Sequence, residues 1–261
     1  MLSALWVSKT GLAAQDIALT TISNNLANVS TVGFKKDRAV FQDLLYQIQK
    51  QPGAQASQET QLPSGLQLGT GVRAAGTQKV FTTGDLQITE NALDVAINGR
   101  GFMQVQLPDG TLGYTRDGQF HLDANGQIVT AKGDPIQPAM TVPEGAQSVT
   151  IGSDGTVSVA LAGETDPTEI GNIQLVDFVN PAGLQAIGGN LFRETASSGA
   201  AQEGTPGLNG LGSVEQGALE NSNVNVVEEL VNMISTQRAY EMNSKVISTA
   251  DQMLQFVSQN L

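Results

Sequence analysis

The side chains that most often perform chemistry are scarce and scattered in this sequence. Cysteine is absent, and the single histidine, His121, lies in an alternation of apolar and polar residues typical of a strand face. A metal site needs several converging His, Cys or carboxylate ligands, and the Asp-Gly loops lack the alternating acids and distal Glu of a calcium loop. The sequence therefore predicts neither a metal ion nor a cofactor.

Two patterns that look like enzyme motifs lack the elements that would have to position them. The segment 69–74 matches a loose dinucleotide fingerprint, but such a fingerprint must follow a strand and open a helix, and here a Gln- and Gly-rich segment leads into strand-like sequence. Ser153, Asp154 and His121 could nominally form a triad, yet no strand-serine-helix elbow presents the serine. We therefore predict that the chain is not an enzyme.

Charge is distributed unevenly along the 261 residues. The net charge is −12, and residues 80–220 hold 17 Asp and Glu against 4 Lys and Arg, whereas the rest of the chain holds 8 against 9. Phosphate binding needs clustered Lys and Arg, so we expect no nucleic-acid partner. The small basic group of Lys35, Lys36 and Arg38 is expected to be a solvated turn.

The sequence also bears on membranes and export. No run of about 18 apolar residues occurs, so we expect no membrane insertion. Residues 1–7 are apolar but lack a basic leading region, and Lys9, Gln15 and Asp16 interrupt the apolar stretch that a cleavable signal peptide requires. If the chain leaves the cytoplasm, a dedicated export machine is therefore expected to carry it.

Both ends of the chain carry apolar residues at seven-residue spacing, which predicts long helices. The first series is Leu5, Leu12, Leu19 and Leu26, joined by Ile22 and Val29. The second is Val226, Met233, Tyr240, Ile247, Leu254 and Leu261, flanked by Val227, Leu230 and Ile234. A helix of about 35 residues reaches about 50 Å and cannot bury such a stripe by itself. We expect a coiled-coil-like pair that also contacts other copies; packing of two ordinary amphipathic helices on the chain's own core is the alternative.

Between the ends the sequence predicts a mainly antiparallel β domain, so the fold class is α+β. Short apolar runs are separated by Asn-Gly and Asp-Gly pairs, which favour two-residue hairpin turns. The predicted division is a helical assembly domain from residues 1–34 and 219–261, an extended connector over 35–78, and a β-rich outer domain over 79–218. The connector is rich in Gln, Gly, Ser and Pro.

Segments at both ends resemble the signatures of the flagellar basal-body rod and hook family. At the N-terminal end these are ISNNLANVST, residues 22–31, and Gly33-Phe34-Lys35; at the C-terminal end they are NSNVNVVEEL, residues 221–230, and QRAYE, residues 237–241. The segments LDVAINGRGF at 93–102 and YTRDGQF at 114–120 also resemble shared segments of rod and hook subunits. The insertion around residues 51–66 is similar to that of the distal rod members of the family.

This resemblance implies a structural axial subunit that polymerises head-to-tail into a rod, transmits torque and encloses an export channel. It implies contacts with other copies, proximal rod and hook-side subunits, the surrounding ring proteins, a rod-capping protein and the export apparatus. It places the protein in the basal body across the periplasm. Besides the two apolar series, Asn25, Asn28 and Asn223 are expected at the assembly interface.

Other functions remain open on the sequence. A proximal rod or hook subunit is one alternative. A secreted β-rich protein that acts on or binds glycans is another, although the two long terminal stripes are hard to explain on that view.

Overall fold

A computed structural model of the chain describes residues 2–53, 64–162 and 166–259. The chain divides into two compact units. Unit 1 combines Met1–Ala27, Asp37–Gln78 and Asn225–Leu261, and unit 2 combines Asn28–Lys36 and Lys79–Val224. No helix among the described residues is both long enough and apolar enough to cross a membrane.

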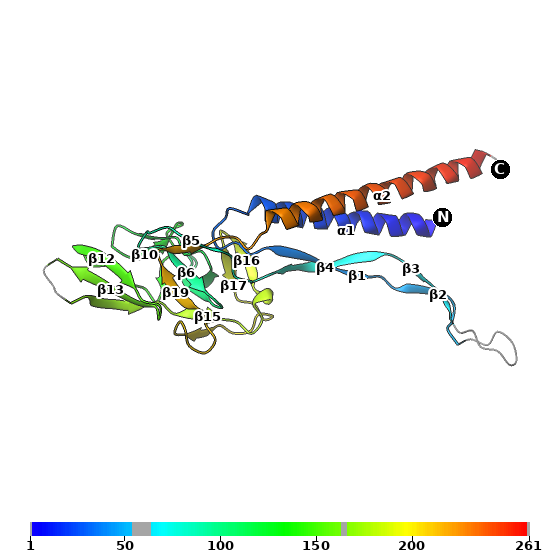
Figure 1. The fold of residues 1–261 in the computed structure, drawn as a ribbon. Coiled ribbons are helices and arrows are strands. Elements are labelled where there is room, and N and C mark those ends of the chain that lie inside the picture. The colour runs from blue at the N-terminus through cyan, green and yellow to red at the C-terminus, as the bar shows by residue number, and fades with distance from the viewer. Residues whose placement is uncertain (1, 54–63, 163–165, 260–261) are drawn as a thin grey trace. The chain divides into compact units, whose positions relative to one another are not determined.

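Unit 1 contains the two long helices and two ribbons of paired strands (Figure 1). Its elements are α1 (Leu2–Ala27), β1 (Asp37–Asp43), β2 (Tyr46–Lys50), β3 (Leu66–Gly69), β4 (Val72–Lys79) and α2 (Val226–Gln259). The helices run antiparallel side by side, and α1 also contacts β1. β1 pairs with β4, and β2 pairs with β3 in antiparallel register. The predicted terminal helices are thus present.

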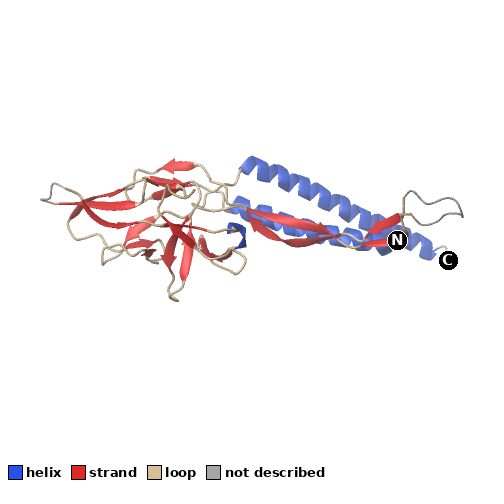
Figure 2. Ribbon diagram, turned by 90° about the horizontal axis from the view of Figure 1, so that it is seen from below, coloured by secondary structure: helices blue, strands red, loops and turns tan. Residues whose placement is uncertain are grey.

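The regular elements of unit 2 are short strands joined by loops (Figure 2). They are β5 (Leu86–Ile88), β6 (Val95–Asn98), β7 (Phe102–Gln106), β8 (Leu112–Thr115), β9 (Phe120–Leu122), β10 (Ile128–Thr130), β11 (Ile136–Gln137), β12 (Ala146–Ile151), β13 (Thr156–Leu161), β14 (Thr168–Asn172), β15 (Leu175–Asp177), β16 (Gln185–Gly188), β17 (Leu191–Arg193), β18 (Gln202–Gly204), β19 (Ser213–Gln216) and β20 (Ala218–Glu220), with a 3-10 turn at Pro181–Gly183.

One sheet of seven strands organises unit 2. Its order is β16-β17-β8-β7-β15-β18, with β11 added on β7. β12, β13 and β14 form a separate three-stranded sheet, and β6 pairs with β19, β5 with β20 and β9 with β10. The registers of all these pairs are antiparallel. The predicted α+β class with an antiparallel β region is confirmed.

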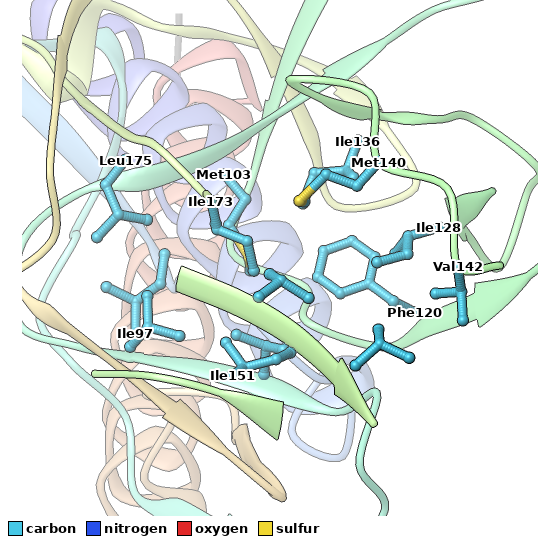
Figure 3. Packing of buried hydrophobic residues seen from close by; sticks show 14 residues of the cluster. Ile97, Met103, Phe120, Ile128, Ile136, Met140, Val142, Ile151, Ile173 and Leu175 are labelled. Atoms are coloured by element: carbon cyan, nitrogen blue, oxygen red, sulfur yellow. The ribbon is translucent and has the colours of Figure 1, made fainter. Parts of the chain in front are cut away.

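Two apolar clusters lie on opposite faces of β7, because successive strand residues point to opposite sides. Met103 belongs to a cluster of fourteen buried side chains that also includes Phe120, Ile136 and Leu175 (Figure 3). Phe102 points to the other cluster, where its ring meets that of Phe178 edge-on at 5.8 Å between centroids. Burial of this kind stabilises a fold by roughly 25 cal/mol per Å² of apolar surface.

The predicted hairpin turns are correct at three of five positions. Asp109-Gly110, Asn125-Gly126 and Asp154-Gly155 connect strands that pair with each other. Each forms a three-residue loop closed by two backbone hydrogen bonds, with the glycine at positive φ, rather than the expected two-residue turn. Asn98-Gly99 and Asp117-Gly118 instead connect strands that pair elsewhere.

The observed units and the predicted domains divide the chain differently. The structure groups residues 28–36 and 219–224 with the β-rich unit, and it groups most of the described part of the connector, with its four strands, with the helices. Much of the predicted insertion, at residues 54–63, lies outside the described residues. The assignment of an assembly role to each predicted domain remains a prediction.

Candidate assembly surface

The seam between α1 and α2 is made of small and polar residues. Ser8, Ala14, Thr21 and Asn25 are the buried residues of α1, and Glu229 and Ala250 are those of α2 among the side chains described. Gly11 faces Asn243 so closely that an added Cβ would lie 3.1 Å from the Asn243 amide nitrogen. Small residues let two helix backbones approach without large interlocking side chains. Among the side chains described, no large apolar residue of either helix is fully buried.

Asn25 fastens α1 to the neighbouring strand and to α2. Its side-chain amide donates to the carbonyl oxygen of Asp37 and accepts from the Asp37 N–H, both at 2.8 Å. The same amide nitrogen lies 3.4 Å from Glu229 Oε2. Asn25 is only 1% exposed, so this predicted interface residue holds the protein's own helices and β1 together.

The start of α2 is set by local sequence. Asn225 Oδ1 accepts hydrogen bonds from the N–H groups of Val227 at 3.0 Å and Glu228 at 3.3 Å, in the first turn of the helix. Glu228 and Glu229 lie in the first turn, where acids complement the helix dipole. The asparagine-rich segment before α2 therefore acts as a helix cap.

The predicted apolar series are covered to different extents. All the predicted leucines of α1, together with Ile22, are partly covered. In α2, Met233, Ile247 and Leu254 are also partly covered, whereas four other predicted apolar positions are exposed to between 39% and 49%: Val226, Leu230, Ile234 and Tyr240. One part of the predicted set is thus partly covered in the single chain, and four positions of α2 are exposed. Leu261 lies outside the described residues.

Many other apolar side chains are also exposed on unit 1, and of these only Val227 was expected from the sequence. They are Trp6, Val7, Ile17, Phe41, Leu45, Tyr46, Ile48, Leu66, Leu68, Val227, Val231, Met242, Val246, Met253 and Phe256. The signal was present in the sequence as apolar residues on several sides of each helix. Extensive exposed apolar surface indicates an interaction site.

Asn28, Val29 and Asn223, also predicted at the interface, belong to unit 2. Thr31 donates a hydrogen bond to Asn28 Oδ1 at 3.2 Å, in the turn that follows α1. The Asn223 amide nitrogen donates to the carbonyl oxygen of Val80 at 2.8 Å, and its Oδ1 accepts from the Lys36 N–H at 2.7 Å. The two Asn223 contacts join chain segments that are distant in the sequence.

A buried ionic cluster lies beside these contacts in unit 2. Lys35 Nζ lies 2.6 Å from Glu220 Oε1, and Arg116 lies 3.2 Å from Glu220 Oε2, with all three side chains at most 3% exposed. Lys35 also donates to the carbonyl oxygen of Thr82 at 2.7 Å, and Arg116 to that of Gly99 at 2.7 Å. Burial lowers the pKa of Lys35 and of Arg116, and the Glu220 charge opposes that change.

This cluster corrects the expectation for the basic residues near 35. Lys35 is not a solvated turn residue but a buried one, because Glu220 compensates its charge. No local pattern indicates this partner, since the two residues are 185 positions apart in the sequence. The cluster holds together the segments by which the chain enters and leaves unit 2.

The residues considered for chemistry have ordinary structural surroundings. His121 is exposed on β9 opposite Val129, and Asp154 accepts a hydrogen bond from the Thr156 N–H inside its turn. Gly71 has a φ of +122°, and the Thr10 side chain lies so close to it that there is no room for a Cβ. Within residues 2–53, 64–162 and 166–259, no group of three or more His, Cys, Asp or Glu could hold a metal ion.

Three family models match this chain. Residues 5–35 match the flagella basal body rod protein family, residues 96–159 the D1 domain of flagellar hook proteins FlgE/F/G, and residues 215–260 the C-terminal region of flagellar basal body rod FlgEFG proteins. These matches include almost all of α1, the centre of unit 2 and all of α2.

Curated relatives match along the whole chain. The flagellar basal-body rod protein FlgG of Buchnera aphidicola subsp. Schizaphis graminum is 58% identical over 259 residues, which cover 99% of this chain and 100% of that protein. FlgG of Borreliella burgdorferi is 49% identical, with 97% of each chain covered. The flagellar hook-basal body complex protein FlhP of Bacillus subtilis is 30% identical, with 99% of each covered. The chain therefore belongs to the family of flagellar basal-body rod proteins.

Proposed function

We propose that this chain is a structural subunit of the flagellar distal rod and not an enzyme. Copies polymerise head-to-tail into a drive shaft that transmits torque from the motor to the hook and encloses the export channel. The observation that carries this proposal is the identity of 58% to a flagellar basal-body rod protein across its full length. The exposed apolar surface of unit 1 supports it, since such a surface needs partners.

The terminal helices form the assembly interface in this proposal. A small, polar seam holds α1 against α2, so their outward apolar side chains remain available for neighbouring copies in a coiled-coil-like arrangement. Contacts between unlike surfaces that do not close into a ring generate a helical filament. The predicted interface residues on α2 with exposed side chains, such as Leu230 and Ile234, then become buried on assembly.

Leu230 offers a direct test of this interface. Leu230→Asp places a charge on a side chain that is 41% exposed and outside the core of unit 2. We expect the variant to fold but to be absent from rods, whereas Ser235→Asp, at an exposed polar position on a different face of the same helix, serves as the matched control. Normal rods from Leu230→Asp cells would count against the assigned interface.

The wider set of partners follows from a position in the distal rod. They are proximal rod subunits, hook-side subunits, the ring proteins around the rod, a rod-capping protein and the export apparatus. The rod spans the periplasm in this proposal, and subunits reach it by the flagellar export route without a cleaved signal peptide.

Unit 2 carries most of the acidic side chains, and its surface is proposed to face outward. Ten acids in the described part of unit 2 are exposed: Asp85, Glu90, Asp109, Asp123, Glu144, Asp154, Asp166, Glu169, Glu194 and Glu203. Two roles fit: a low-adhesion bearing against the rings, or the maintenance of solubility. Amide substitutions at Glu144, Asp154, Asp166 and Glu169 should raise rotational friction if the bearing role holds, and leave swimming speed unchanged if only solubility matters.

The connector insertion is proposed to stiffen the rod. Ordered between neighbouring subunits, it would block the sliding that bending requires. Deletion of residues 51–67 should therefore yield a bendable rod, and a rod of unchanged stiffness would refute this role.

Electron microscopy of purified protein tests the proposal as a whole. The intact chain at high concentration should form straight tubes or fibres, and a chain lacking residues 1–27 and 225–261 should not. These cuts keep Glu220 and Asn223, which unit 2 uses internally. Soluble monomers from both forms, with the helices protected from protease, would instead show that the helices pack only within their own chain.

A further inference from the structure

A groove lies at one end of unit 1, between the first turns of α1, the β2-β3 hairpin and α2. Its volume is about 790 Å³, and its walls include Ala4, Val7, Gln47, Leu68 and Val246. This is large enough for several side chains. The groove belongs entirely to residues of unit 1.

The rim of the groove is rich in exposed apolar surface. Trp6, the only tryptophan of the chain, is 56% exposed, and Lys9 Nζ lies 5.4 Å from the centre of its ring. Leu68 and Val246 are 43% and 47% exposed. Lys9 is also the only charged residue of α1 before Asp16. The groove therefore favours an apolar segment whose end carries negative charge.

The helix register provides such a segment at the end of α2. Asn25 contacts Glu229 and Gly11 faces Asn243, so the antiparallel pairing places residue 2 of α1 near residue 252 of α2. Residues 253–259 then extend past the start of α1 by about 10 Å at 1.5 Å per residue. Figure 1 shows the C-terminal end of α2 beyond the N-terminal end of α1.

The chemistry of this overhang complements the groove. Met253, the first residue of the overhang, is 49% exposed, and Asp251 comes two residues before it. The last turn of α2 contains no basic residue. The carbonyl end of a helix carries partial negative charge, which Lys9 can complement. The overhang cannot fold back into its own groove, because α2 is one continuous helix that leads it away from α1.

We propose that the groove receives residues 253–259 of α2 from a second copy of this chain. This assignment rests on the proposed function and specifies one contact within it. Groove and overhang are different surfaces, so each copy offers one of each. The contact is therefore heterologous and can repeat without limit along a filament.

Disulfide cross-linking tests the contact, because the chain has no cysteine of its own. Val7→Cys and Met253→Cys chains are mixed, allowed to assemble and oxidised. We expect a disulfide-linked dimer that contains one chain of each kind. The matched control pairs Val7→Cys with Met242→Cys, which lies on the same helix and is 64% exposed, and it should give no such dimer.

The same samples separate this inference from the proposed function. Fibres without the Val7–Met253 product, or with a stronger product from the Met242 control, would overturn the groove assignment and leave the rod proposal standing. If a segment other than residues 253–259 occupies the groove, fibres form without the Val7–Met253 product. Absence of both fibres and cross-link would contradict both.

A charge-pair exchange gives a second measurement. Val7→Glu places a carboxylate opposite the negative helix end, and Met253→Lys places a cation beside Lys9, so each single variant should lose fibre elongation. The double variant should regain it, because the new charges face each other across two copies. A double variant with folded unit 2 that elongates no better than either single variant would overturn the proposal.

Discussion

Units 1 and 2 differ sharply in what they bury. In the described part of unit 1 the only buried apolar side chains are Ala14 and Ala250, whereas unit 2 buries large side chains such as Phe102, Phe120 and Met103. Large apolar residues of unit 1 are instead exposed over both helices and the strand ribbons. Unit 2 thus completes its core within one chain, and unit 1 leaves much of its apolar surface exposed in the single chain.

The largest expected effect is loss of the buried charge cluster in unit 2. Glu220→Gln leaves Lys35 and Arg116 buried without their counter-charge, which costs about 3–5 kcal/mol in comparable buried pairs. Denaturant unfolding of unit 2 reports the loss. Glu215→Gln, at a partly exposed position that accepts a bond from Asn98, is the control.

A triple variant separates charge from packing in this cluster. Lys35→Met, Arg116→Met and Glu220→Leu together replace the charges by apolar groups and should recover much of the stability that Glu220→Gln loses. If the single and triple variants unfold alike, the charge explanation for the cluster is wrong.

The comparison of the two units can be sharpened with two methionines. Met103→Ala removes a side chain with 0% exposure from the core of unit 2 and should cost about 2–5 kcal/mol of monomer stability. Met242→Ala, at 64% exposure on α2, should change monomer stability by less than about 0.5 kcal/mol. Thermal unfolding of monomers measures both, and equal losses would contradict the contrast between the units.

The smallest effect concerns pH and Asp117. Burial raises the pKa of this carboxyl, although hydrogen bonds from Gln119 and Asn190 oppose the change. The folded state thus keeps the Asp117 proton to higher pH than the unfolded chain does. The stability that the protonated carboxyl contributes is present below the unfolded pKa and is lost as pH rises through the folded pKa.

Asp117→Asn removes this dependence. The variant should gain a little stability at neutral pH and none below the ordinary aspartate value of 3.8. Unfolding midpoints at both pH values test it, with Asp85→Asn at an exposed position as the control. A gain of equal size at both pH values would show that ionisation of Asp117 is not the cause.

The sequence predicted the elements better than it predicted their contacts. Seven-residue spacing identified both helices, and alternation with Asp-Gly pairs identified the antiparallel strands, because both signals are local. The small-residue seam was missed, since Ser8, Gly11 and Ala14 carry no apolar periodicity. Leucine spacing therefore indicated helices without indicating which helix face touches α2.

Long-range polar contacts also escaped prediction. Lys35, Arg116 and Glu220 come from three distant segments, and each alone resembles a solvated surface charge. Asn25 and Asn223 were found through the family resemblance, but the structure assigns them hydrogen bonds within the chain. Only the assembled topology brings such partners together.

Hydrogen exchange of monomer and polymer tests the central claim most directly. Amides of α1 and α2 should exchange fast in the monomer and slowly in the polymer, because neighbouring copies cover and stabilise these helices. Amides of β7 and β15 should be protected equally in both forms. Helices already protected in the monomer as strongly as these strands would contradict the account.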